Sequence, residues 1–330
     1  MAALRGKALI AYLLVCVLWG STYLAIRVGV GALPPLLFAG IRFLVAGLIL
    51  LGGALALGAH LPRRARDWGV LAVVGLFLLA GGNSSLVWAE QFTPSGVASI
   101  FVTTIALWMA FFDAVVPGGS GRLSPRVVAG LLLGIVGSML LVGTGPRDLF
   151  RADLRGPIAL TLASASWAIG SVYYKRRHPD VSPYVGAAIQ MVAAGLVVTL
   201  LGLAAGEART VRLTAPGLEA LGYLVVFGSI IGYTAYAYAL RHASATAVGT
   251  YAYVNPPIAV LLGRIFLGEP IGARTVVAMV LILGAVLWIQ FSHEVPAPEP
   301  EPAPVGAAPS TGASCAPRAT PDTGSTAAAD

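Results

Sequence analysis

Long apolar runs separated by short polar segments make up most of this chain. Each run is about 18–24 residues long, which matches the length that an α-helix needs to cross the hydrocarbon core of a bilayer. A transmembrane β-barrel would instead show alternating polarity in segments of about ten residues. The pattern therefore predicts an all-α polytopic membrane protein with ten transmembrane helices. They are expected at residues 9–29, 34–57, 69–88, 95–116, 126–143, 157–174, 183–204, 217–238, 245–267 and 273–291.

The pattern of apolar and polar positions occurs twice along the chain. When Trp19 is aligned with Trp167, the register holds through the next apolar run, where Arg42 aligns with Gln190. Each copy contains five predicted helices, and because five is an odd number, the second copy enters the bilayer from the opposite side. Two inverted five-helix repeats are typical of secondary transporters, which bind their substrate near the bilayer midplane. The predicted repeats cover residues 1–145 and 146–292.

The composition of the chain agrees with a lipid environment. The chain is 57% hydrophobic and 11% charged, with a mean hydropathy of +0.84, whereas soluble domains are about one-quarter charged. The first apolar run is longer than the core of a signal peptide, so we expect it to remain as a helix. From residue 293 onward Pro, Ala, Ser, Thr and Glu dominate, and residues 293–330 are therefore predicted to form a disordered cytoplasmic tail.

The basic residues indicate how the chain is oriented in the membrane. If the N-terminus is cytoplasmic, the inner segments carry most of the Lys and Arg residues, including the run Lys175-Arg176-Arg177. This bias predicts that both termini are cytoplasmic. The formal net charge of +7 does not indicate a nucleic-acid partner, because the basic residues lie at the ends of the spans rather than on one face.

Polar and aromatic side chains near the middle of the spans are candidates for a substrate cavity, because a polar group in hydrocarbon is costly and therefore indicates function. The first and sixth predicted helices carry such residues at corresponding depths, and other predicted helices add further polar and aromatic side chains. The cavity candidates are Trp19, Ser21, Thr22, Arg42, Asn83, Trp167, Ser171, Gln190, Tyr236, Tyr251 and Asn255.

Four of these candidates, Trp19, Trp167, Tyr236 and Tyr251, are expected to form an aromatic wall of the cavity. A buried tyrosine hydroxyl needs a hydrogen-bond partner, which favours a polar surrounding. The faces of aromatic rings also attract cations. The aromatic wall is therefore expected to suit amphipathic or cationic organic solutes.

The predicted ninth helix contains the run Asn255-Pro256-Pro257 near its middle. The two prolines remove two backbone donors and leave carbonyl groups free around residues 250–253. Either Asn255 and these carbonyl groups line the cavity, or the site is a structural kink that the neighbouring helices seal.

Two charged residues at membrane depth need a partner or a role. Arg42 has three interpretations: it extends toward the outer interface, it pairs with Glu90 or Asn83, or it binds a substrate carboxylate. Glu90 closes the third predicted helix, either as a solvated end charge or as the group that couples transport to a proton. We expect the structural pair with Arg42 to be the first role of Glu90. Arg264 and Glu269 are expected to anchor the outer end of the ninth helix.

The chain lacks the motifs of other membrane-protein classes. No GxxxxGK[ST] loop occurs, so an ATP motor within the chain is not expected. All four histidines lie in loops or at span ends, which leaves a membrane enzyme without catalytic groups. The two cysteines have no metal-ligand spacing, and no cofactor is predicted. A channel and a non-transporting membrane receptor remain as alternatives to a transporter.

A set of short motifs extends over residues 8–290. It comprises Trp19-Gly20-Ser21-Thr22-Tyr23, Pro34-Pro35, Arg42-Phe43, Gly82-Asn83, Pro94-Ser95-Gly96, Ser166-Trp167-Ala168, Gly228-Ser229-Ile230, Tyr251-Ala252-Tyr253-Val254-Asn255-Pro256 and Leu267-Gly268-Glu269. Together these motifs resemble the EamA family of the drug/metabolite transporter superfamily, with the closest likeness to its bacterial inner-membrane members. The resemblance implies two repeats and the export of small metabolites or drugs. One departure is that Arg122 stands in the first repeat where Glu269 stands in the second.

We therefore expect a secondary transporter that exports a small organic solute by alternating access. Its two repeats are expected to move around a site near Trp19, Trp167, Tyr236, Tyr251 and Asn255. The expected partners are the solute, the lipid bilayer, and a proton or another coupling ion. Both a monomer and a homodimer remain open.

Overall fold

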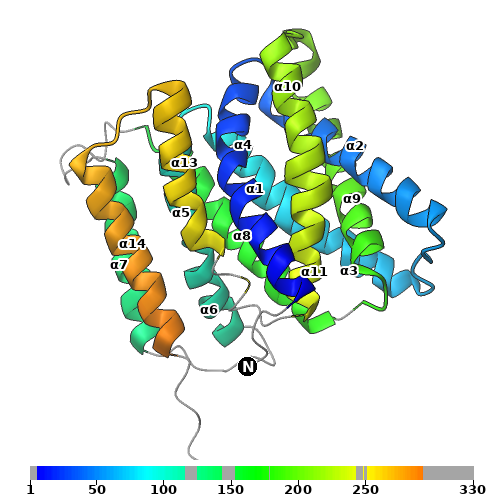
Figure 1. Ribbon diagram of the computed structural model, residues 1–330, viewed down its shortest axis with the longest axis horizontal. Helices are drawn as coiled ribbons and strands as arrows, with labels where there is room; N and C mark the ends of the chain where they lie inside the picture. The colour runs from blue at the N-terminus through cyan, green and yellow to red at the C-terminus, as the bar shows by residue number, and fades with distance from the viewer. Residues whose placement is uncertain are drawn as a thin grey trace, which may run out of the picture. The chain divides into compact units, whose positions relative to one another are not determined.

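The computed structural model describes residues 6–115, 125–142, 153–177, 179–242, 248 and 251–292. Every regular element within these ranges is a helix (Figure 1). The predicted tail at 293–330 lies outside them. The helices of the first half are α1 (Lys7–Val30), α2 (Pro35–Ala56), α3 (Ala65–Gly75), η1 (Leu76–Asn83), α4 (Ser84–Ala89), α5 (Ser95–Val102), α6 (Ile105–Val115) and α7 (Pro125–Val142). Those of the second half are α8 (Arg155–Arg177), α9 (Pro183–Ala204), η2 (Glu207–Thr210), α10 (Ala215–Tyr223), η3 (Leu224–Tyr233), α11 (Thr234–His242), α13 (Tyr251–Leu267) and α14 (Ala273–Ser292).

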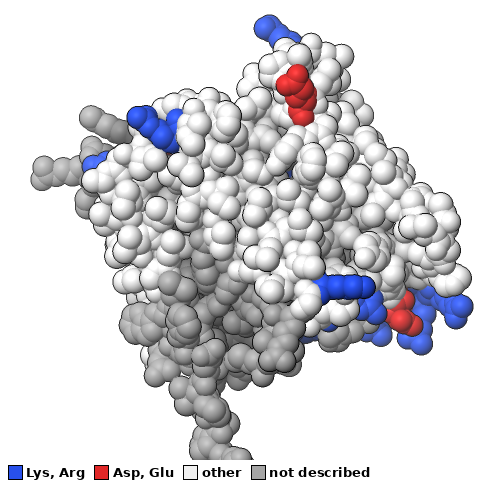
Figure 2. Space-filling view, viewed as in Figure 1, with Lys and Arg blue, Asp and Glu red and all other residues white. Residues whose placement is uncertain are grey.

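Five helical segments of the described residues are long and apolar enough to cross a membrane. They are Lys7–Val30, Pro35–Ala56, Ala65–Ala89, Pro183–Ala204 and Ala215–His242. Large apolar side chains on their outer faces, such as Ile10, Leu48 and Leu200, are exposed, as expected where lipid is the solvent. Figure 2 shows charged side chains toward two edges of one face and almost none across its middle. This distribution fits helices whose ends lie at the two surfaces of a membrane.

The most extensive helix pair is α2 with α9, which occupy corresponding places in the two halves. Glycines allow the backbones of these helices to approach. A side chain at Gly47 would collide with the backbone of Val192, and a side chain at Gly195 would collide with the backbone of Leu44. Small residues at helix crossings are the usual means of close packing within membranes. The last helices of the two halves, α7 and α14, also pair with each other (Figure 1).

Two π-helical segments interrupt the helices at the centre of the fold. η1 continues α3 and begins at Leu76, and η3 continues α10 and begins at Leu224. These two starting residues are separated by the same offset that aligns Trp19 with Trp167. A π-helix is rare and is frequently found at functional sites. Its presence at the same place in both halves marks this depth of the fold as a candidate site.

Each π segment accepts a hydrogen bond from the opposite half of the chain. Trp19 Nε1 in α1 donates to the carbonyl oxygen of Gly228 in η3 at 3.1 Å. In the other direction, Ser166 Oγ in α8 donates to the carbonyl oxygen of Phe77 in η1 at 2.7 Å. The π segments are therefore places where the two halves are joined by polar contacts as well as by apolar packing.

One predicted helix is divided in the structure, and another stays continuous although it contains two prolines. The helix predicted at 95–116 is divided into α5 and α6 at Thr103 and Thr104, whose hydroxyl groups hydrogen-bond to carbonyl groups of the preceding turn. Such bonds offer the backbone an alternative to the regular helix. By contrast, α13 continues through Pro256 and Pro257 without a break, although these prolines remove two donors.

Candidate functional site

A cavity of about 50 Å³ lies between the two halves of the chain. The first half contributes residues from α1, α2 and η1, and the second half contributes residues from α8, η3 and α13. The predicted candidates that line the cavity are Trp19, Thr22, Arg42, Asn83, Trp167, Tyr251 and Asn255. The other predicted candidates, which lie outside this lining, are Ser21, Ser171, Gln190 and Tyr236.

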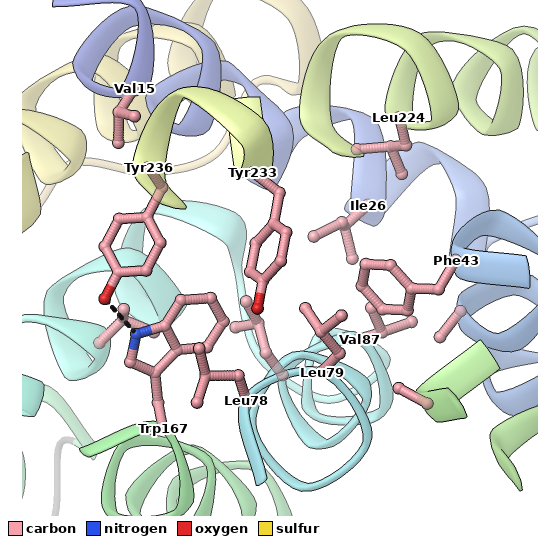
Figure 3. Packing of buried hydrophobic residues seen from close by; sticks show 14 of the residues in the cluster. Val15, Ile26, Phe43, Leu78, Leu79, Val87, Trp167, Leu224, Tyr233 and Tyr236 are labelled. Carbon is pink, nitrogen blue, oxygen red and sulfur yellow. Dashed lines mark hydrogen bonds between the residues drawn. The ribbon is translucent and has the colours of Figure 1, made fainter. Parts of the chain in front are cut away.

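Trp19 is the centre of an aromatic cluster to which four helices contribute. The centroid of its ring lies 5.6 Å from that of Trp167, 5.0 Å from that of Tyr236 and 5.0 Å from that of Tyr251. Trp167 Nε1 also donates to the Tyr236 hydroxyl at 3.4 Å (Figure 3). Each such ring pair adds about 0.5–1.5 kcal/mol beyond the burial of its area. The four residues expected to form the aromatic wall therefore lie together and hold one another in place.

Arg42 is buried on α2, with 3% of its surface exposed, and reaches both π segments. Its Nε donates to Ser229 Oγ of η3 at 2.9 Å, and its Nη1 donates to Asn83 Oδ1 of η1 at 3.3 Å. The contact with Asn83 was one of the predicted interpretations and is present. The expected pair with Glu90 is wrong, because the hydrogen bonds of Arg42 go to the π segments and not to the end of α4. Extension to the outer interface is also wrong, because the side chain is buried.

A corresponding polar pair occurs in the second half. Gln190 on α9 aligns with Arg42, and Tyr233 of η3 aligns with Asn83 when a slippage of two residues is allowed. The Tyr233 hydroxyl donates to Gln190 Oε1, and both residues are buried. Sequence reasoning missed Tyr233 and Ser229 as site residues. The repeat alignment could have identified Tyr233, and the motif Gly228-Ser229-Ile230 could have identified Ser229.

Asn255 on α13 is buried and bonds to α1. With its amide nitrogen facing the carbonyl groups, it donates to the Cys16 oxygen at 3.1 Å and to the Tyr251 oxygen at 3.3 Å. The orientation of the amide is assigned from these hydrogen bonds. The Tyr23 hydroxyl contacts the same side chain. Asn255 thus lines the cavity and bonds to a carbonyl group of α1, while α13 runs uninterrupted through the two prolines.

Two of the predicted serines support the site instead of lining it. Ser21 Oγ lies 2.6 Å from the Tyr223 hydroxyl, away from the cavity. Ser171 Oγ donates to the carbonyl oxygen of Trp167 at 2.8 Å and lies 3.5 Å from the Tyr236 hydroxyl. Ser171 therefore contacts two members of the aromatic wall from behind.

Glu90 follows α4 and is fully buried, so the interpretation as a solvated end charge is wrong. Within the part of the chain that the structure describes, neither of its carboxylate oxygens accepts a hydrogen bond. Arg27 of α1 donates instead to the main-chain carbonyl oxygen of Glu90. A buried carboxylate without hydrogen bonds is costly unless a nearby charge or a bound proton neutralises it. Glu90 does not line the cavity, and its coupling role stays a prediction.

Two glutamates of the second half hold helix N-termini of the first half. The Glu207 carboxylate accepts from the N–H groups of Leu36 at 3.2 Å and Leu37 at 2.8 Å, at the start of α2. The Glu269 carboxylate accepts from the N–H and the hydroxyl of Ser95, both at 2.9 Å, at the start of α5. The first N–H groups of a helix lack partners within it and carry a partial positive charge, so a carboxylate stabilises them. Glu269 therefore bonds a helix of the other half, a role that the sequence pattern did not predict.

A cavity of about 860 Å³ lies at the C-terminal end of α2 and the N-terminal end of α9. The α2–α3 loop, the α8–α9 loop and the end of α11 line it, with Arg63, Arg64 and Arg241 facing it together with Asp67 and Asp180. Arg241 Nη1 also donates to a main-chain carbonyl group of the α8–α9 loop at 2.5 Å. Figure 2 shows basic side chains gathered at this end of the helices.

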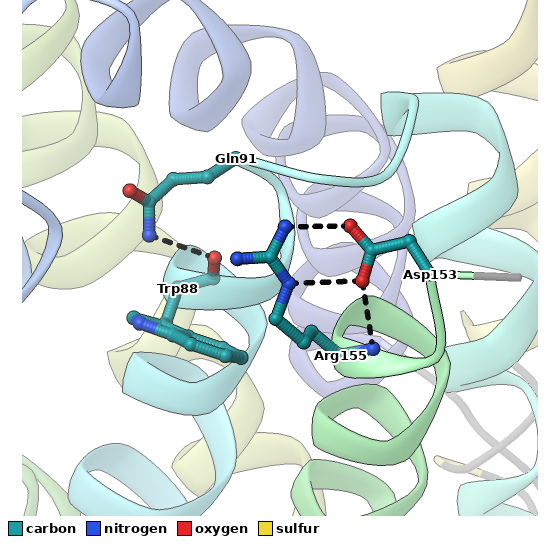
Figure 4. A network of polar contacts seen from close by, with 4 residues as sticks. All are labelled: Trp88, Gln91, Asp153 and Arg155. Carbon is teal, nitrogen blue, oxygen red and sulfur yellow. Dashed lines mark hydrogen bonds and ion pairs between the residues drawn. The ribbon is translucent and has the colours of Figure 1, made fainter. Parts of the chain in front are cut away.

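The start of α8 carries an exposed ion pair outside the membrane-spanning helices. Arg155 Nη2 lies 2.7 Å from Asp153 Oδ2 (Figure 4), and the Arg155 guanidinium lies 4.0 Å from the centroid of the Phe92 ring. The hydrogen bonds from Arg155 hold the pKa of Asp153 below its ordinary value. Because both side chains are exposed, such a pair contributes little to stability. It orders the chain at the entrance to α8 and takes no part in the cavity.

Comparison with known proteins identifies the family of this chain. The profile of the EamA-like transporter family matches residues 6–143 and again residues 154–291. The "Uncharacterized inner membrane transporter YedA" of Escherichia coli strain K12 is 39% identical over 274 residues, which cover 83% of this chain and 87% of YedA. The "Probable amino-acid metabolite efflux pump" of Salmonella typhimurium is 28% identical over 287 residues, which cover 82% of this chain and 90% of that protein.

A solved structure supports the fold independently of these sequence matches. A crystal structure of a protein with 23% sequence identity has a TM-score of 0.63 and covers 87% of this chain and 98% of its own. The names of the family and of the sequence relatives indicate a transporter rather than an enzyme. With two family matches that span most of its length, this polytopic α-helical membrane protein belongs to the EamA-like transporter family.

Proposed function

We propose that this protein is a secondary transporter that exports a small organic solute by alternating access. The observation that carries the proposal is the cavity, which residues of both halves line at the depth of the two π segments. A substrate site between two repeats near the midplane is the arrangement that secondary transporters use. The name of the Salmonella typhimurium relative, an amino-acid metabolite efflux pump, supports export of a small metabolite.

The size of the cavity supports a cycle with more than one state. A volume of about 50 Å³ is enough for about three or four water molecules, whereas small-molecule sites measure about 300–1,000 Å³. A solute therefore requires the two halves to separate around Trp19 and Arg42. In alternating access, the halves separate first toward one membrane surface and then toward the other.

We further propose the topology that this cycle needs. Ten spans form two inverted repeats, at residues 1–145 and 146–292, in a bacterial inner membrane. Both termini and the tail at 293–330 are cytoplasmic. The end that carries Arg63, Arg64 and Arg241 then faces the cytoplasm, in accordance with the positive-inside rule. The end that carries Glu207 and Glu269 faces outward.

Counterflow from proteoliposomes against a panel of labelled metabolites tests the transport proposal. We expect saturable exchange of at least one solute, and about a tenfold or greater loss of exchange in Trp19→Ala. The matched control is Trp68→Ala, which removes an exposed tryptophan at a helix end. Flux without saturation would indicate a channel, and binding without flux would indicate a receptor.

Cysteine labelling tests the topology. In a variant without Cys16 and Cys315, a single cysteine at position 34 directly precedes α2, and one at position 64 directly precedes α3, after the loop that follows α2. We expect an impermeant thiol reagent added to intact cells to label position 34 and not position 64. Labelling at position 64 from outside would contradict the proposed orientation.

A further inference from the structure

We propose that the exported solute is an organic anion whose negatively charged group binds Arg42 and whose apolar part lies against the aromatic wall. A carboxylate is the simplest such group, because it matches the planar fork of a guanidinium. This inference rests on the proposed transport function and names the chemical class of its substrate.

Arg42 carries a buried charge that has no acidic partner in the described part of the chain. Its two hydrogen bonds go to the hydroxyl of Ser229 and to the side-chain oxygen of Asn83, both of which are neutral. Among the described residues, the ion pair that the structure contains is the exposed one of Asp153 and Arg155. A buried ion without a counter-ion is costly. The cavity next to Arg42 is therefore a place where an anion is stabilised.

The guanidinium of Arg42 also has donors to spare. A guanidinium carries five N–H groups, and the hydrogen bonds to Ser229 and Asn83 use two of them. The remaining groups lie on Nη1 and Nη2, and the residue lines the cavity. Two adjacent free donors of this kind are what a bidentate carboxylate requires.

Two successive residues of η3 position both the guanidinium of Arg42 and the indole of Trp19. Gly228 accepts the indole N–H of Trp19 through its carbonyl oxygen, and the next residue, Ser229, accepts from Arg42. A Cβ atom at position 228 would lie 2.9 Å from Nη2 of Arg42, so a larger residue there would displace the guanidinium. Adjacent residues of η3 thus position the indole, through a backbone carbonyl group, and the guanidinium, through a side-chain hydroxyl. Preorganisation of this kind reduces the entropy lost on binding.

The cavity-lining residues that the structure describes in the second half add no further charge. Gln190 stands at the position of Arg42 and is neutral, and it already accepts from Tyr233. Arg27, the arginine of α1, lies at Glu90, outside the cavity lining. Of the described residues that line the cavity, Arg42 is therefore the one with a positive charge, and it lies beside the aromatic rings. This charge opposes the cationic solutes that an aromatic wall alone would suit and favours monoanions.

Matched probe pairs test the inference with the purified full-length protein. The probes are phenylacetate with phenylacetamide, indole-3-acetate with indole-3-acetamide, and benzoate with benzamide, each pair sharing one ring system. We measure their protection against thermal unfolding and their competition in counterflow. The acid of each pair is expected to act at a concentration at least tenfold lower than its amide, because hydrogen bonds to charged groups are the stronger ones.

Variants connect this preference to Arg42. Arg42→Gln is expected to remove the preference for acids, while Arg42→Lys keeps part of it because it retains the charge without the fork. Arg264→Gln, which removes an exposed arginine of α13, is the matched control and is expected to leave the preference unchanged. If Arg42→Gln does not fold, the comparison of acid with amide in the wild type and in Arg42→Lys still decides whether the site prefers anions.

The outcomes separate this inference from the transport proposal. Equal effects of acids and amides in the wild type, or an unchanged preference in Arg42→Gln, would overturn the anion class. If counterflow of neutral or cationic metabolites is found in that case, the transport proposal stands alone. If no solute of any charge exchanges, the transport proposal itself fails.

Discussion

The two ends of the helices are built in different ways. At one end, carboxylates of the second half hold the first turns of α2 and α5 through five hydrogen bonds. At the other end, a cavity of about 860 Å³ lies between the loops, with three arginines facing it. The end that is tied by carboxylates is the proposed outer end, and the end with the large cavity is the proposed cytoplasmic end.

This difference falls where the two halves no longer repeat each other. In the repeat alignment, Ala59 stands in the first half where Glu207 stands in the second, and Arg122 stands where Glu269 stands. The π segments and the central tryptophans, by contrast, occur in both halves. Duplication of the sequence therefore accounts for the centre of the molecule, whereas the residues that tie one end are present in one copy only. In the proposed alternating-access cycle, this difference gives the protein a means of favouring one open state over the other.

Removal of the Glu269 carboxylate is expected to have the largest effect on this difference. Glu269→Ala leaves the first turn of α5 without its cap, which costs about 0.5–2 kcal/mol, and so favours opening at that end. A single cysteine at Val102, which lines the cavity at the far end of α5, reports the opening. We expect its labelling rate by an impermeant reagent from outside to rise by about tenfold.

The control for this experiment is Glu219→Ala, which removes an exposed glutamate of α10 at the same end. Its labelling rate is expected to match that of the parent protein. An equal rise in both variants would mean that net charge, and not the cap of α5, holds this end closed.

Replacement of Glu207 is expected to act in the same direction but more weakly. Glu207→Gln keeps one acceptor for the N–H groups of α2 and loses the charge, which is worth about 0.3–1 kcal/mol at a helix N-terminus. The labelling rate at position 102 should then rise by about two- to fivefold. A rise larger than that in Glu269→Ala would show that α2, and not α5, controls the opening.

The reverse substitution tests whether a carboxylate can tie the other end. Ala59 lies in the same cavity as Ser182, which caps α9. Ala59→Glu places a carboxylate near that helix start, so we expect thermal unfolding to shift upward by an amount that corresponds to a few tenths of a kcal/mol. Solute uptake from that side should become slower. A destabilised protein with unchanged uptake would contradict the comparison of the two ends.

The smallest expected effect is the energetic coupling between Glu90, which follows α4, and Arg42, which lines the cavity. Arg42 and Glu90 share no hydrogen bond in the described part of the chain. The losses in exchange rate from Arg42→Gln and Glu90→Gln should therefore add within about 0.3–0.5 kcal/mol when the two are combined. A coupling energy above about 1 kcal/mol would restore the pairing that the sequence suggested.

The pH dependence of transport in the Glu90→Gln variant decides whether Glu90 couples transport to a proton. Glutamine has the shape of protonated glutamate and cannot release a proton. Loss of pH dependence with equal-concentration exchange preserved would identify Glu90 as the coupling group. An unchanged pH dependence would exclude this role for Glu90.

Much of the molecule follows from local pattern along the chain. The length of the apolar runs placed the helices, because crossing hydrocarbon requires about 20 apolar residues whatever the neighbours are. The aromatic wall was also predictable, because Trp19 and Trp167 stand out as rings at the middle of spans that the repeat brings into register. The family matches at 6–143 and 154–291 agree with this duplicated pattern.

The partners of the charged residues were decided by the tertiary structure. Arg42 meets Ser229 across 187 residues, and Glu269 meets Ser95 across 174 residues. Hydropathy and periodicity report how deeply a residue lies, but they do not report which helix lies opposite. The nearest acidic candidate by depth, Glu90, was therefore a reasonable partner for Arg42 and the wrong one.

The π segments show the same division. Nothing in the composition of Leu76–Asn83 or Leu224–Tyr233 distinguishes them from an ordinary apolar helix. Their wider turns coincide with hydrogen bonds from Trp19 and Ser166, which come from the opposite half of the chain. The sequence by itself determined that helices cross the membrane at these residues. The form of each helix, and the position of Arg42 beside an aromatic cavity, depended on contacts that exist only when the two halves are packed together.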